Sequence, residues 1–156
     1  MSYINPLFNN SDITNKKPIY EKEKPVKRQT RAPRKDKTHS IKFPVTVPMQ
    51  MKLKSYCKQA ARINNHLGKP PLTQTKFNNQ LLRFGLKHEN ILRWDFEYMD
   101  TKNYMHTNIL EIEYEDIGGP HGYSVRKSIS DRKTVFFIIQ SVLKWLEGEG
   151  SLEKVL

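Results

Sequence analysis

The sequence predicts an α+β fold: a disordered basic arm, then a short strand and two helices, and a small mixed C-terminal part that ends in an amphipathic helix. Three patterns support this prediction. Apolar and polar residues alternate over residues 41–47. Residues 49–63 and 74–87 place apolar side chains three or four positions apart, and residues 131–147 do so with more apolar residues. Alternation is typical of a half-buried strand, and the wider spacing is typical of a helix with one buried face.

The predicted strand has one apolar and one polar face. The apolar face consists of Ile41, Phe43, Val45 and Val47. The polar face, which begins just before the strand, consists of Ser40, Lys42 and Thr46. Pro48 ends the strand and can occupy the first turn of a helix, where its missing N–H costs nothing. A polar strand face that stays free of packing is a surface that can be offered to DNA.

Two helices are expected after the strand. The first covers residues 49–63, and its buried stripe consists of Met49, Leu53, Tyr56, Cys57, Ala60 and Ile63. Residues 64–71 contain Gly and Pro residues that end it. Thr73 can cap the second helix, over residues 74–87, because its hydroxyl can accept a hydrogen bond from the amide of Thr75 or Lys76. The expected buried residues of the second helix are Phe77, Leu81, Phe84 and one of Leu82 or Leu86.

This strand and its two helices are too small to form a stable monomer. They enclose little core, and a lone strand leaves both of its edges unpaired. The simplest remedy is a two-fold dimer in which each chain contributes its 41–47 strand to an antiparallel ribbon. The sequence therefore predicts a homodimer.

Residues 91–156 are predicted to form a third region. Apolar and polar residues alternate over 92–98 and again over 110–115, which predicts two strands, although an acidic helix is an alternative for the second segment. Ser130 is a good cap for a helix that runs to about Glu147 and stops at Gly148.

The charge is unevenly distributed along the chain. The net charge is +11; residues 1–40 contain ten Lys and Arg against four acidic residues, residues 41–92 nine against one, and residues 93–156 eight against eleven. A basic front half indicates a polyanionic partner, and an acidic back half indicates a different one. We expect residues 1–38 to be a disordered basic arm, because they can bury too little apolar surface to offset the entropy of ordering. The arm residues expected to contact phosphates are Arg34, Lys35 and Lys37.

Several function classes find no support in the sequence. No run of eighteen apolar residues is present to span a bilayer, and the single cysteine fits a reducing compartment, so we expect a cytoplasmic protein. The five histidines lack metal-ligand spacing with Cys57, and no phosphate-binding loop, dinucleotide fingerprint or nucleophile elbow is found. We therefore expect neither an enzyme nor a cofactor or metal site.

Residues 39–88 resemble the ribbon-helix-helix family of DNA-binding proteins, which includes plasmid copy-number repressors, phage repressors, antitoxins and relaxosome accessory proteins. The resemblance rests on the 41–47 strand, its exit at Pro48, the apolar stripe of the first helix and the segment Leu72-Thr73-Gln74-Thr75-Lys76-Phe77. That segment is similar to the family's Leu-Ser-x-Ser-acidic-apolar entry to the second helix, with Lys76 in place of the acidic residue. Pro44 within the strand and the long connection before Leu72 depart from the family.

The resemblance implies that the paired strands of a dimer enter the major groove of DNA. The residues that would contact base edges are Ser40, Lys42 and Thr46. The start of the second helix would hold a phosphate, and the residues that would contribute there are Lys69, Thr73, Gln74, Thr75 and Lys76. The expected function is sequence-specific binding of double-stranded DNA. The protein would act as a transcriptional repressor, or as a plasmid accessory factor that recruits a relaxase. Residues 91–156 would bind that partner or assemble higher homo-oligomers.

Two other functions remain open from the sequence. A basic RNA-binding or ribosome-associated protein would use the arm and the basic helices on phosphates, although the basic half has few aromatic residues for stacking on bases. A protein-interaction module would instead bind an acidic protein through the arm.

Overall fold

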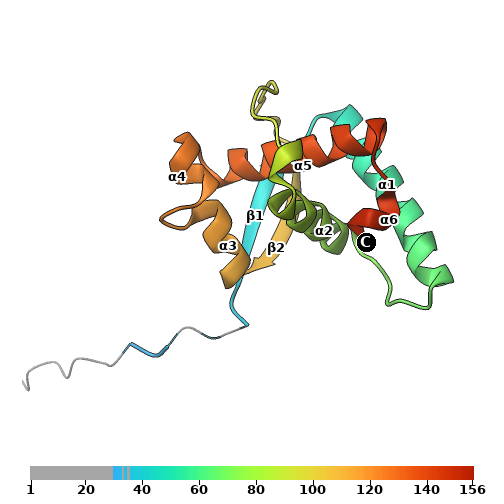
Figure 1. Cartoon of the computed structure of the whole chain (residues 1–156), viewed down its shortest axis with the longest axis horizontal. Helices are drawn as coiled ribbons and strands as arrows, with labels where there is room; N and C mark the ends of the chain where they lie inside the picture. The colour runs from blue at the N-terminus through green and yellow to red at the C-terminus, as the bar shows by residue number, and fades with distance from the viewer. Residues whose placement is uncertain (1–29, 33, 35) are drawn as a thin grey trace, which may run out of the picture. The chain divides into compact units, whose positions relative to one another are not determined.

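Two antiparallel strands of the same chain form the sheet on which the helices pack (Figure 1). β1 covers Thr38–Pro44 and β2 covers Tyr104–Leu110. In their register, Lys42 lies opposite His106 and Ile41 lies opposite Thr107. This computed structural model describes residues 30–32, 34 and 36–156.

The remaining elements are helical and connect or follow the strands. In chain order they are α1 (Val47–His66), α2 (Gln74–Lys87), the 3-10 helix η2 (Glu89–Ile91), α3 (Glu111–Gly118), α4 (Tyr123–Lys127), α5 (Asp131–Gly148) and α6 (Leu152–Val155). The fold is therefore mixed α+β, as the sequence predicts. Within the described residues, no helix is both long enough and apolar enough to cross a bilayer.

Helices α2 and α5 cover one face of the sheet, which we call the inner face. α2 packs against β2, and α5 packs against β1 and α2 (Figure 1). The inner-face side chains that are fully or almost fully buried are Ile41, Phe43, Met105, Thr107 and Ile109. α2 and α5 approach closely at Gly85, where a β-carbon would lie 2.4 Å from Cγ2 of Ile138.

The helix caps follow the local sequence. The Thr73 hydroxyl accepts a hydrogen bond from the Lys76 amide at 3.3 Å, and the Ser130 hydroxyl accepts one from the Lys133 amide at 3.2 Å. α2 ends at Lys87 and α5 at Gly148, and both helices are confirmed as predicted. α1 starts earlier than predicted because Thr46 caps it, accepting a hydrogen bond from the Met49 amide at 3.4 Å.

The partner of β1 corrects the argument for a dimer. β1 pairs with β2 of its own chain, so the first strand does not lack an intramolecular partner, and its need for a second copy disappears. The 39–90 and 91–156 segments, expected to be separate domains, share this sheet and lie within one compact unit, Pro33–Leu156. The two-chain ribbon expected from the family resemblance is therefore replaced by a ribbon within one chain.

Pro44 is compatible with this ribbon. Hydrogen bonds from Val45 N to Asn103 O and from Glu111 N to Lys37 O show that odd-numbered residues form the hydrogen-bonded pairs. Pro44 lies opposite Tyr104 in a pair that exchanges no such bonds, so its missing N–H is not needed by β2.

Two strand predictions for the acidic half were wrong. Residues 92–98 form no strand. Their apolar side chains alternate with exposed ones because the apolar ones are half-buried against the core. The ring centres of Trp94 and Phe137 of α5, for example, lie 5.8 Å apart. Residues 111–118 are the acidic helix α3, the alternative considered for that segment.

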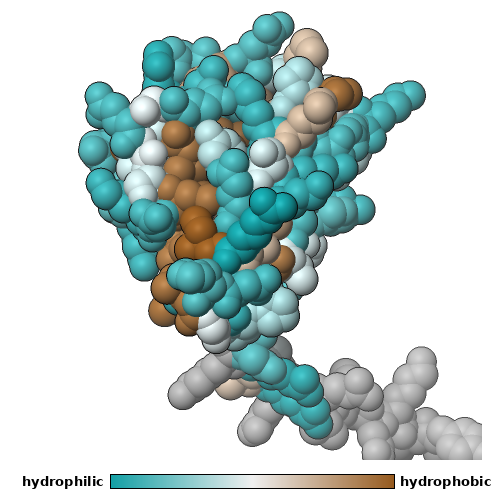
Figure 2. Space-filling view, turned by 90° about the vertical axis from the view of Figure 1, so that its right-hand side faces the viewer, coloured by the Kyte–Doolittle hydropathy of each residue, from teal (hydrophilic) through white to brown (hydrophobic). Residues whose placement is uncertain are grey.

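The end of the molecule that carries α1 and α6 has a mixed surface. Figure 2 shows a band of hydrophobic side chains there, surrounded by hydrophilic ones. Leu67, which follows α1, is 59% exposed. The buried residues of α1 include Met49, Leu53, Cys57 and Ala60, as predicted, whereas Tyr56 and Ile63 of the predicted stripe are half-buried. Burial raises the pKa of the Cys57 thiol, because it disfavours the charged thiolate.

Candidate nucleic-acid interface

The face of the sheet opposite α2 and α5, which we call the outer face, is exposed. Side chains alternate between the two faces of a strand, so the even-numbered residues of β1 and β2 share this face. Its exposed residues are Thr38, Ser40, Lys42, His106, Asn108 and Leu110. This surface is two strands wide, which matches the width of a ribbon that the major groove of B-DNA admits.

Four polar side chains form the centre of the outer face. Lys42 lies opposite His106 and Ser40 lies opposite Asn108. Directly opposite residues in pairs of this kind have Cα atoms about 4.5 Å apart, so the four side chains are neighbours. Together they offer an ammonium group, an imidazole, a hydroxyl and an amide, which can both donate and accept hydrogen bonds.

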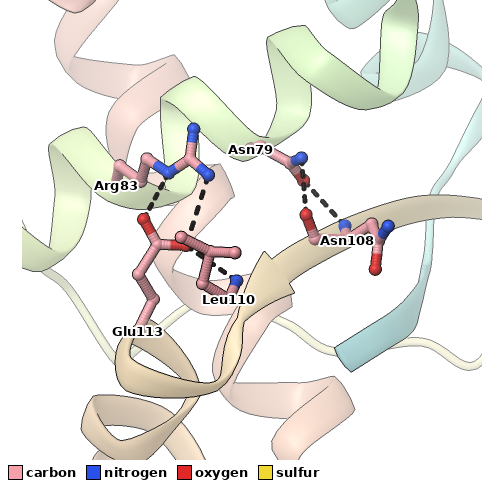
Figure 3. Close-up of polar contacts among 5 residues, drawn as sticks. All are labelled: Asn79, Arg83, Asn108, Leu110 and Glu113. Atoms are coloured by element: carbon pink, nitrogen blue, oxygen red, sulfur yellow. Dashed lines mark hydrogen bonds and ion pairs between the residues drawn. The ribbon is translucent and has the colours of Figure 1, made fainter. Parts of the chain in front are cut away.

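Helix α2 closes the free edge of β2. The Asn79 side chain donates to Asn108 O and accepts from Asn108 N, both at 2.7 Å (Figure 3). Asn78 Nδ2 donates to His106 O at 3.0 Å. Figure 3 also shows the Asn108 side chain pointing away from α2. The helix thus fixes the backbone of β2 and leaves the side chain of Asn108 free for a ligand.

Ion pairs hold the end of the ribbon where α3 begins. Arg83 of α2 binds the Glu113 carboxylate at 2.5 and 3.3 Å, and that carboxylate also accepts from Leu110 N at 3.0 Å (Figure 3). Glu111 pairs with His39 and, at 3.3 Å, with Lys37. The hydrogen bond from His39, with the help of Lys37, lowers the pKa of Glu111. The His39 ring stacks on Tyr114 at a centroid distance of 4.0 Å.

Cations flank the outer face. Lys76 and Arg83 lie three positions before and four positions after Asn79, so they share the side of α2 that meets the β2 edge. Arg132 of α5 lies 5.2 Å from the ring centre of Tyr104, which is opposite Pro44. Arg83 is paired with Glu113, so Lys76 and Arg132 are the charges that can attract the phosphates on either side of a groove.

Two of the three residues predicted to contact bases lie on this surface. Ser40 and Lys42 are exposed on the outer face. Thr46 is not part of it, because β1 ends at Pro44 and the Thr46 hydroxyl caps α1. The prediction extended the strand too far, since a threonine before Val47-Pro48 is also a good helix cap.

The predicted phosphate contacts occupy several places. Thr73 uses its hydroxyl as a cap, and Thr75 is half-buried. Gln74 is turned inward, donating to Leu53 O at 3.4 Å and to Asn78 Oδ1 at 3.0 Å, so its side chain does not face a ligand.

The basic residues among the predicted phosphate contacts are mostly exposed. Lys69 and Lys76 are exposed and line the same open cavity. Arg34 is exposed, whereas Lys37 is paired with Glu111. Lys35 lies outside the described residues, as does most of the predicted arm.

His106 and Asn108 are absent from the residues that the sequence predicts to bind DNA. Residues 104–110 alternate large apolar or threonine side chains, Met105, Thr107 and Ile109, with polar ones. That alternation is a strand signal of the same kind as the one used for residues 41–47. The alternation over residues 104–110 is therefore sufficient to predict β2 and its exposed polar residues.

Comparison with protein-family models, with curated proteins and with solved structures finds no match for this chain. We therefore infer its function from the surface described above.

Proposed function

We propose that this protein binds double-stranded DNA by placing the outer face of the β1–β2 ribbon in the major groove. One observation carries the proposal: the outer face groups Ser40, Lys42, His106 and Asn108, while the inner face of the same strands is apolar core. The side-chain types match base edges. Lysine donates to the O6 and N7 acceptors of guanine, and asparagine can bind N6 and N7 of adenine with two hydrogen bonds.

The ribbon is held in a way that suits base recognition. Asn79 ties the backbone of β2 to α2, and Arg83 ties α2 to α3 at the end of β2. Side chains that bind bases from a fixed backbone lose less entropy on binding than side chains on a loose strand. Since both strands come from one chain, a single molecule has a complete ribbon.

The charge of the chain supports a polyanionic partner. The net charge is +11, and the interface has Lys42 at its centre with Lys76 and Arg132 nearby. Phosphate contacts of this kind give affinity and orientation, and the ribbon supplies sequence preference. Such a protein can act as a repressor or as an accessory factor in plasmid DNA processing. In the second role, the acidic helix α3 is a suitable surface for a protein partner.

Selection of genomic fragments by the purified protein, followed by footprinting, tests the proposal. We expect a protected duplex of defined sequence. Lys42→Ala should weaken binding to that duplex by about 1–3 kcal/mol and reduce the preference over a scrambled duplex. Lys58→Ala, on the exposed side of α1, is the matched control and should change both affinities equally. Equal affinity for duplex DNA, single-stranded DNA and structured RNA would contradict the proposal.

The basic N-terminal residues have a separate predicted role. Removing residues 1–32, which contain seven Lys and Arg against three acidic residues, should lower the affinity for all duplexes by a similar factor. The slope of log affinity against log salt concentration should become shallower. Loss of binding to the selected duplex alone would show that these residues contribute to base recognition.

A further inference from the structure

A second site lies along α2, and its lining includes Asn79, the residue that holds the edge of β2. An open cavity of about 440 Å³ is bounded by α2, the end of α1 and the connection between them. Its polar lining residues are Asn64, Lys69, Lys76, Asn79, Gln80 and Arg83. A neighbouring cavity of about 420 Å³ continues along α2 past Gln80 and Arg83 to Lys87 and His88.

The cavity is positively charged. Arg83 is neutralised by Glu113, but neither Lys69 nor Lys76 forms an ion pair with any residue that the structure describes. Both lysines are exposed. Two unpaired ammonium groups in the lining of the cavity favour an anionic ligand over a metal cation.

The cavity also contains unused hydrogen-bonding capacity. Asn64 is only 5% exposed, and its Oδ1 has no hydrogen-bond partner within the described part of the chain. The buried Gln80 Oε1 likewise has no hydrogen-bond partner among the described residues. Buried amide groups in proteins are nearly always hydrogen-bonded, so an N–H donor that reaches these two oxygens would satisfy them.

We propose that this cavity binds a nucleoside phosphate, either free or as one unit of a single strand. Lys69 and Lys76 bind its phosphate, and the amides of Asn64 and Gln80 accept hydrogen bonds from its base. Pro71, Leu72 and Leu156 form an apolar wall against which the base can lie. The volume falls within the range of about 300–1,000 Å³ that small-ligand sites have. The second cavity can hold the neighbouring unit of a strand, with the exposed His88 ring beside it.

Calorimetric titration with deoxynucleoside monophosphates tests the site. The probes are dCMP and dAMP, which carry amino donors, with deoxyribose 5-phosphate and inorganic phosphate as ligands that lack a base. We expect dCMP and dAMP to bind roughly 3- to 10-fold more tightly than deoxyribose 5-phosphate for each amide oxygen that is satisfied. Equal affinity for dCMP and deoxyribose 5-phosphate, or no binding of any of these ligands, would overturn the proposal.

Variants separate the two halves of the site. Asn64→Leu and Gln80→Leu are each expected to reduce the preference for dCMP over deoxyribose 5-phosphate while leaving phosphate binding in place. The fold should survive the Asn64 change, because the bond from Lys69 N at 2.8 Å is made to the backbone carbonyl of Asn64. Lys76→Gln should weaken all phosphate-bearing ligands, and Lys58→Gln, outside the cavity, should weaken none. An unchanged preference in both amide variants would refute base recognition here.

The source of the ligand is decided by the same titration with the single-stranded dinucleotide d(CpC). Binding more than 10-fold tighter than dCMP assigns the site to a strand that also enters the second cavity, and equal binding assigns it to free nucleotides. Lys42→Ala should change neither result. Failure of the ribbon to bind duplex DNA would therefore leave the base preference of this cavity untouched, although Lys76 is common to both surfaces.

Discussion

The inner and outer faces of the β1–β2 sheet are built from alternate residues of the same two strands, yet they have opposite environments. Phe43 and Ile109 on the inner face are at most 1% exposed, beneath α2 and α5. Lys42 and Asn108, each one residue away in sequence, are exposed on the outer face. Neighbouring residues in one strand can therefore serve stability and binding separately, so substitutions on the two faces should give different kinds of defect.

The largest effect is expected on the inner face. Phe43→Ala removes a side chain that is 0% exposed and should lower the free energy of unfolding by about 3–5 kcal/mol. Lys42→Ala should change it by no more than about 0.5 kcal/mol, because Lys42 is exposed. Urea denaturation followed by circular dichroism measures both. A stability loss for Lys42→Ala comparable to that for Phe43→Ala would show that the outer face is also packed and would remove the basis for a binding surface there.

A smaller effect is expected at the edge of β2. Asn79→Leu leaves the N–H and C=O of Asn108 without the partners that Asn79 provides at 2.7 Å, and should cost about 1–3 kcal/mol of stability. Hydrogen exchange should speed up at the Asn108 amide and little at amides of α5. Asn108→Ala is the matched control, since it removes only the outward-facing side chain and should leave both stability and exchange nearly unchanged. If exchange at Asn108 is not accelerated in Asn79→Leu, the α2 contact does not hold the ribbon.

The two faces also show which features could be predicted from the sequence. The caps at Thr73 and Ser130 depend on the hydroxyl and on amides within three residues, so local sequence is sufficient to place them. The pairing of β1 depends on β2, far along the chain. No local pattern shows that β1 will pair with β2, and without β2 the strand can find a partner only in a second copy of the chain.

The half of the candidate site that lies on β1 follows from local sequence, and its pairing with the half that lies on β2 does not. Ser40 and Lys42 were found from the alternation of β1. His106 and Asn108 complete the surface only because the register places them opposite those residues, and register is a tertiary property. The inward turn of Gln74 could not be foreseen either, since it depends on the carbonyl of Leu53 in another helix.

The smallest predicted effect concerns the end of the sheet, where Glu111 joins His39 on the inner side to Lys37. The bond from His39 and the charge of Lys37 lower the pKa of Glu111 from its usual value of 4.5. The folded state therefore holds this carboxylate ionised more readily than the unfolded state does. The resulting stabilisation is present above the usual pKa and is lost as the pH falls through the lowered folded-state pKa.

Glu111→Gln tests this contribution. The wild-type protein should be slightly more stable than the variant at pH 7, and the difference should shrink towards zero as the pH falls below 4. It should also shrink at high salt, because the Lys37 and Glu111 side chains are 52% and 36% exposed. Urea denaturation at several pH values measures it. A difference that persists at low pH and high salt would mean that the ionised Glu111 carboxylate is not the source of this stabilisation.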